Sequence, residues 1–110
     1  MTPVCSVFDI PEGEARTFDF PNESNRTFFI LHWGDRFYAY LNRCPHTGIA
    51  LEHQENQFLS WDKGHIQCAM HGALFNIGNG RCIWGPCRGQ SLQSLPLQIV
   101  DDQIFVDLTT

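Results

Sequence analysis

The sequence predicts an all-β fold in which an antiparallel β base carries an inserted, smaller β subdomain. Nine glycines and six prolines are spread along the chain, and 13% of the residues are aromatic, a composition typical of short strands joined by turns. No segment keeps a long apolar period of 3.6 residues, so helices should be minor at most. With 110 residues, 43% of them hydrophobic, the chain can form one compact domain.

The first forty residues alternate between apolar and polar side chains, as half-buried strands do. Strands are expected at Val4–Ile10, Ala15–Phe20, Thr27–Trp33 and Phe37–Leu41. The turn-prone run Pro11-Glu12-Gly13 separates the first two. Gly34-Asp35 separates the last two and suits the positive φ angles of a tight hairpin turn.

The middle of the chain has shorter strand-like segments divided by Gly, Asn and Pro, and the end has another hairpin. Strands are expected at Phe58–Trp61, His65–Cys68, Ala73–Asn76, Arg81–Trp84, Pro96–Val100 and Ile104–Leu108. We therefore expect one domain, with a base of about residues 1–42 and 89–110 and a subdomain of about 43–88.

Charge and hydropathy limit the partners. The net charge of −5 argues against nucleic acid, whose phosphates would repel the protein. The acidity belongs to the base, which carries −6, whereas residues 43–88 carry +1. The N-terminal residues lack a signal-peptide pattern and no apolar run approaches a membrane span, so no membrane contact and a cytoplasmic location are expected.

Two short motifs hold the residues suited to metal binding. Cys44-Pro45-His46 forms C-x-H and, after 21 residues, Cys68 and His71 form C-x-x-H. Two thiolates and two imidazoles match a [2Fe–2S] cluster with cysteines on one iron and histidines on the other. Structural zinc also uses two Cys and two His. Zinc motifs usually place the two cysteines in one motif and the two histidines in another, whereas each motif here contains one of each. A zinc-stabilised binding module remains the alternative.

These motifs resemble the Rieske family, and the match extends to Gly72, Phe75 and a Gly85-Pro86 pair similar to the family's proline loop. The resemblance implies three stacked antiparallel sheets. It also implies one [2Fe–2S] cluster held by Cys44, His46, Cys68 and His71, with both histidines near the surface at one tip.

The sequence departs from the respiratory and photosynthetic members of that family. Ile49 and Met70 stand where those proteins have a disulfide, and Ala73 and Phe75 stand where they have hydroxyl groups that donate to the cluster sulfurs. Fewer donors stabilise the reduced state less, which predicts a potential at the lower end of the range of about −150 to +300 mV. The resemblance is therefore to the low-potential, soluble, oxygenase-associated ferredoxins.

The function this implies is one-electron transfer and not catalysis, since no second set of two histidines and a carboxylate is visible for an oxygenase iron. Electrons would pass from a flavin-dependent reductase to a Rieske-type oxygenase, each docking transiently at the His46/His71 tip. A small Rieske-like subunit of an assimilatory nitrite reductase is an alternative.

Packing roles are expected for the remaining cysteines and for the tryptophans. These residues are Cys5, Cys82, Cys87, Trp33, Trp61 and Trp84.

Overall fold

The computed structural model describes residues 1–21, 23–45, 59–60, 64–68, 72–85 and 89–109. Strands dominate this part of the chain, and its one helix is a short 3₁₀ helix, η1 (Val7–Asp9). The predicted all-β class is confirmed. The strands are β1 (Thr2–Ser6), β2 (Ala15–Phe20), β3 (Glu23–Trp33), β4 (Arg36–Leu41), β5 (Ile66–Gln67), β6 (Leu74–Phe75), β7 (Cys82–Trp84), β8 (Leu97–Val100) and β9 (Gln103–Val106).

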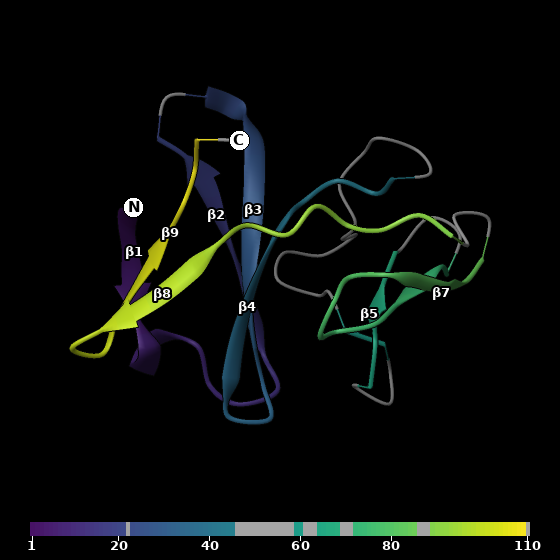
Figure 1. Ribbon diagram of the computed structural model, residues 1–110, viewed down its shortest axis with the longest axis horizontal. Helices are drawn as coiled ribbons and strands as arrows, with labels where there is room; N and C mark the ends of the chain where they lie inside the picture. The colour runs from purple at the N-terminus through teal and green to yellow at the C-terminus, as the bar shows by residue number, and fades with distance from the viewer. Residues whose placement is uncertain (22, 46–58, 61–63, 69–71, 86–88, 110) are drawn as a thin grey trace.

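These strands form three antiparallel sheets of three strands each (Figure 1). The terminal sheet has the order β1-β9-β8, so it joins the two ends of the chain. The long sheet has the order β2-β3-β4, and the small sheet, β5-β6-β7, comes from the middle of the sequence. The three sheets that the family resemblance implied are therefore present.

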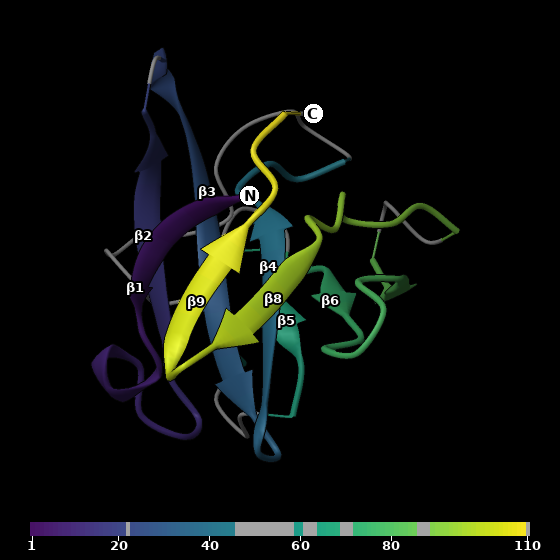
Figure 2. The ribbon, with the colours of Figure 1, turned by 60° about the vertical axis from the view of Figure 1, so that its left-hand side comes forward.

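The long sheet lies between the other two because its strands are apolar on both faces. In β3, Phe28 and Ile30 pack with Ile104 and Val106 of the terminal sheet. The alternate residues Phe29 and Leu31 pack in the second core cluster, which also contains Ile66, Phe75 and Cys82 of the small sheet. Neighbouring strand residues point to opposite faces, so the continuous run Phe28–Leu31 supplies both cores. Figure 2 shows β8 and β9 passing in front of β3 and β4.

The first predicted strand, Val4–Ile10, is wrong beyond Ser6, because the chain turns there into η1. The Ser6 hydroxyl accepts from the Phe8 amide at 3.2 Å, and the Asp9 carboxylate accepts from the Ser6 amide at 2.9 Å. This reciprocal cap satisfies backbone donors that a continuing strand would have paired with a neighbour. Apolar alternation alone did not reveal it.

The strands of the middle segment are shorter than predicted. Of Phe58–Trp61, Leu59 makes a single bridge to Ile66, and Phe58 and Trp61 lie outside the described residues. Arg81, predicted to begin a strand, instead makes one bridge to Ser91. The strands β5, β6 and β7 have only two, two and three residues. The boundary of the inserted subdomain at about 43–88 stays a prediction.

The positive φ angles expected at the Gly34-Asp35 turn are present, and the turn of the second predicted hairpin has positive φ angles as well. Gly34 and Asp35 have φ angles of 62° and 63°, and Asp101 and Asp102 have 51° and 65°. The Glu12 carboxylate accepts from the amides of Asp35 at 3.0 Å and Gly34 at 2.8 Å, which ties the Pro11–Gly13 turn to this hairpin. These hydrogen bonds lower the pKa of Glu12, and the bond from the Asp35 amide has the largest effect.

Among the described residues, no helix is long and apolar enough to cross a membrane.

Candidate metal centre

Cys44 follows the end of β4 and is 1% exposed. The segment before it is anchored to β3, since the Asn42 amide donates to the Thr27 carbonyl and the Asn42 side chain donates to the Thr27 hydroxyl, each at 3.0 Å. The Arg43 amide donates to the Leu41 carbonyl at 2.8 Å, which turns the chain out of the strand. The first motif therefore begins from a fixed point at the edge of the long sheet.

Cys68 follows β5 and is fully buried. Its amide donates to the Ala73 carbonyl at 2.9 Å, and its carbonyl accepts from the Gly72 amide at 2.9 Å. These two bonds hold Gly72 and Ala73 beside Cys68, and Gly72 takes a φ of 66° that side chains disfavour. Cys68, the first residue of the second motif, is thus held at the end of the small sheet.

The two thiols belong to one core cluster, although 24 positions separate them in the sequence. That cluster also holds Ala73 and Phe75, both buried, together with Phe29 and Leu31 from the long sheet. Two buried sulfur donors, brought together from separate loops, fit the cysteine half of a [2Fe–2S] site. Neither Ala73 nor Phe75 has a hydroxyl to donate to a sulfur atom there.

Gly85 lies against the same loop. A Cβ atom at residue 85 would lie 2.9 Å from Ala73, and the φ of Gly85 is 108°. Only glycine fits this approach, because a side chain would collide with Ala73 and would strain the backbone. Gly85 is therefore in close contact with Ala73, whose carbonyl oxygen accepts from the Cys68 amide, whereas Pro86 lies outside the described residues.

Trp84 does not have the packing role expected for the tryptophans. Its side chain is 60% exposed, and its ring lies over Gly72, 3.8 Å from where a Cβ of that residue would be. Its neighbour Ile83 is 38% exposed. Trp33 is partly buried and packs against the core, as expected. The sequence pattern alone did not distinguish this exposed tryptophan, which lies beside the second Cys/His motif, from a core residue.

Several predicted residues lie outside the described part of the chain: the ligands His46 and His71, and also Ile49, Trp61, Met70, Pro86 and Cys87. Cys82 is described, buried in the core cluster, and its thiol donates to the Trp84 carbonyl at 3.4 Å. Cys5 is half-buried against the other core, and desolvation, helped by nearby Asp9, raises the pKa of its thiol to about 11. No disulfide joins the cysteines of the described residues.

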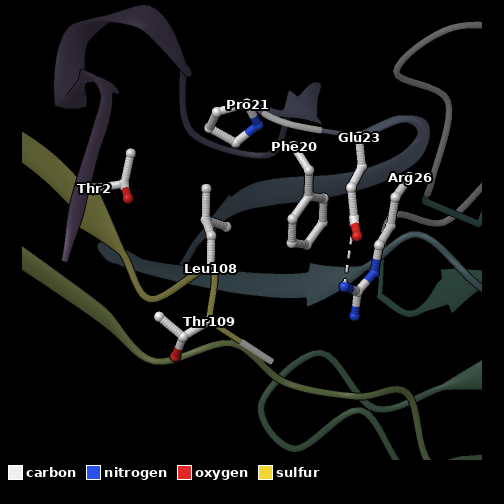
Figure 3. Close-up of a pocket in the computed structure, with 7 residues that line it drawn as sticks. All are labelled: Thr2, Phe20, Pro21, Glu23, Arg26, Leu108 and Thr109. Atoms are coloured by element: carbon white, nitrogen blue, oxygen red, sulfur yellow. Dashed lines mark hydrogen bonds and ion pairs between the residues drawn. The ribbon is translucent and has the colours of Figure 1, made fainter.

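A pocket of about 390 Å³ lies elsewhere, between the two chain ends and the turn from β2 to β3 (Figure 3). The Arg26 guanidinium beside it is 3.3 Å from the Glu23 carboxylate and lies 4.6 Å above the Phe20 ring. This charge is thus already paired with an acid. None of the lining residues comes from the loops of Cys44 or Cys68.

Comparison with known proteins gives a consistent result. The Rieske [2Fe–2S] domain family matches residues 1–100. The chain is 29% identical over 104 residues to the 3-phenylpropionate/cinnamic acid dioxygenase ferredoxin subunits of Escherichia coli (strain K12) and Shigella flexneri serotype 5b, covering 94% of this chain and 90% of theirs.

Solved structures share the fold. The ferredoxin of carbazole 1,9a-dioxygenase from Nocardioides aromaticivorans IC177 superposes with a TM-score of 0.74 at 21% identity, over 96% of this chain and 97% of that one. The Sphingomonas yanoikuyae B1 ferredoxin gives a TM-score of 0.73 at 20% identity, over 96% and 95% of the two chains. The arrangement of sheets, the pair of buried cysteines and the family match agree, and the chain belongs to the Rieske [2Fe–2S] domain family, whose cofactor is a single [2Fe–2S] cluster.

Proposed function

We propose that this protein is a one-electron carrier that passes electrons from a flavin-dependent reductase to a Rieske-type oxygenase. The observation that carries the proposal is the convergence of Cys44 and Cys68, from two separate loops, in one buried core cluster. The similarity to ferredoxin subunits of a dioxygenase spans 94% of the chain, and it supports a carrier and not an enzyme.

In this proposal Cys44, His46, Cys68 and His71 bind the [2Fe–2S] cluster, which supplies a single-electron couple when bound. The chain's part is to hold the ligands and to control their surroundings. Burial of both cysteines keeps water from the sulfur atoms, and the bonds from Cys68 to Ala73 and Gly72 fix one ligand loop. With Ala73 and Phe75 nearby, two side-chain donors are missing, which supports a low potential.

Docking is proposed at the tip that carries His46 and His71. The exposed Trp84 supports this location, since it lies on Gly72, the residue that follows His71 in the sequence. Large aromatic side chains contribute strongly to the centre of protein interfaces. Arg43 and Arg81 are both exposed and both belong to residues 43–88, which carry +1, whereas the base carries −6. An acidic partner would thus be oriented towards the tip and away from the base.

The ligand set is tested with single substitutions in the full protein. Cys44→Ser and Cys68→Ser should each lose the visible absorption of the cluster and its low-average-g EPR signal after dithionite reduction. Cys82→Ser is the matched control, because Cys82 is equally buried in the same core cluster and is not a proposed ligand. Stoichiometric zinc without iron in the purified protein would instead identify a zinc-stabilised module.

The carrier role is tested by transfer from the reduced protein to a Rieske oxygenase in a single turnover. We expect one electron to be transferred per cluster. The change in the carrier's visible absorption as it is oxidised, after oxygenase and substrate are added, measures this number. Stable co-purification with a large nitrite-reducing flavoprotein, with no transfer to an oxygenase, would favour the nitrite reductase alternative.

A further inference from the structure

A second group of metal-ligating side chains lies in the base, apart from the cysteine loops. Glu12, His32 and Asp35 each offer one ligand atom, and these three atoms all lie within 4.8 Å of one another. The residues come from two turns, Pro11–Gly13 and the β3–β4 hairpin, which the fold joins. The Gly13 amide donates to the His32 carbonyl at 2.7 Å. Figure 1 shows the chain between η1 and β2 running beside this hairpin.

The imidazole of His32 is positioned before any ion binds. Its Nδ1 lies 2.8 Å from the Ile10 carbonyl oxygen, and its ring stacks on Phe37 with a centroid distance of 4.0 Å. Because a carbonyl oxygen only accepts, Nδ1 carries the hydrogen, and Nε2 is the atom turned towards Glu12. A backbone carbonyl bound to the other ring nitrogen is the usual support of a metal-ligating histidine.

The carboxylate of Glu12 is also positioned, by hydrogen bonds from backbone amides. Its two oxygens accept from the amides of Gly34 and Asp35, at 2.8 and 3.0 Å, and a carboxylate has about four lone-pair sites, so these two bonds do not use its whole capacity to accept. Its Oε1 lies 3.6 Å from His32 Nε2, which is beyond a good hydrogen bond. Two ligand atoms bound to the same zinc ion at about 2.1 Å lie about 3 to 3.4 Å apart, so this pair needs only a small adjustment.

Asp35 supplies the third donor from the tip of the hairpin. It is exposed, so its side chain can rotate towards the other two without disturbing a packed core. One imidazole nitrogen and two carboxylate oxygens suit Zn²⁺ better than Ca²⁺, which prefers oxygen alone, or copper(I), which prefers sulfur.

We propose that Glu12, His32 and Asp35 form a divalent-metal site for Zn²⁺, with water completing its coordination. The site is separate from the [2Fe–2S] ligands and lies in the acidic base. An ion there joins the Pro11–Gly13 turn to the β3–β4 hairpin, whose strands supply Phe29, Leu31 and Tyr40 to the core around the cysteines. Its expected effect is to stabilise the fold, since an ion that binds only the folded chain raises its stability.

The test uses the protein with its iron–sulfur cluster in place and Zn²⁺ as the probe. Isothermal titration calorimetry in a non-chelating buffer measures stoichiometry and affinity, while the visible absorption confirms that the cluster stays intact. Asp35→Asn removes one ligand charge and keeps the turn, because asparagine accepts a positive φ well. Asp102→Asn is the matched control, since Asp102 has nearly the same φ, 65° against 63°, in the other hairpin.

We expect the unmodified protein and Asp102→Asn to bind one Zn²⁺ with equal affinity, and Asp35→Asn to bind it at least about tenfold more weakly. Zn²⁺ should raise the Tm of the first two and not of the third. His32→Gln, which leaves the turn residues unchanged, should also abolish binding. This second variant keeps the test valid if Asp35→Asn does not fold. Absence of one-to-one binding, or equal binding by all variants, would show that the group only hydrogen-bonds the turn.

Discussion

Gly85 and Ala73 are in closer contact than any side chain at residue 85 would permit, since a Cβ there would lie 2.9 Å from both Cα and Cβ of Ala73. Ala73 in turn accepts the amide of Cys68 through its carbonyl oxygen. The contact therefore connects the chain entering Pro86 with the loop that carries a proposed cluster ligand.

Substitution of Gly85 by alanine should move the Gly85-Pro86 segment away from the 68–73 loop. The positive φ and the collision with Ala73 together should destabilise the protein by about 1–3 kcal/mol. The midpoint potential should change as well, because water would gain access to the cluster. Thermal unfolding and a potentiometric titration measure the two effects. Gly89→Ala is the control, since it has a similar φ of 93° but no atom within 4 Å of its Cβ position; an identical potential in both variants would contradict the prediction.

Replacement of Phe75 by tyrosine should raise the reduction potential. Phe75 is fully buried in the core cluster that contains both thiols, so a hydroxyl on its ring would enter that environment. One hydrogen bond to a sulfur atom, at about 1 kcal/mol, corresponds to about 40 mV for one electron. Spectroelectrochemistry of the two proteins measures the difference. Phe29→Tyr, another fully buried ring of the same core cluster but on β3, tests whether any added hydroxyl has this effect.

Removal of the Trp84 side chain should weaken docking and leave the cluster unchanged. In a coupled assay with an oxygenase, Trp84→Ala should raise the KM for the carrier about tenfold or more, as expected for an aromatic residue at the centre of an interface. The EPR spectrum and the midpoint potential should stay as they are. Phe8→Ala is the control, because Phe8 is 79% exposed on η1 in the base. A normal KM for Trp84→Ala would place the docking surface elsewhere.

The reactivity of Cys5 should depend on pH over an unusually high range. Burial and Asp9 raise the pKa of this thiol from 9.0 to about 11, which lowers its thiolate fraction at pH 8 about a hundredfold. Alkylation of Cys5 should therefore be slow at pH 8 and should keep accelerating with pH until about 11. Peptide mapping by mass spectrometry follows this residue separately from the other cysteines. An alkylation rate that levels off near pH 9 would show that the thiol is not shifted.

Some features followed directly from the order of residues. The Gly34-Asp35 turn and the strands on each side of it were predictable because both the turn chemistry and the alternation of side chains are local. The two Cys/His motifs were likewise visible as spacings, and they selected the family and its cofactor. Val7–Asp9 was not predictable in the same way, since the Ser6–Asp9 cap competes with a strand pattern of equal strength.

The tertiary structure decided what the one-dimensional pattern leaves open. Cys44 and Cys68 share one core cluster only because the long and small sheets pack on each other, and the exposure of Trp84 depends on which face of the small sheet is left uncovered. Glu12 and His32 are 20 positions apart and approach each other only when two turns join. Local sequence indicated the candidate ligands and the turns, because motif spacing and turn chemistry depend on neighbouring residues. Long-range packing determined which of the described residues lie in one cluster.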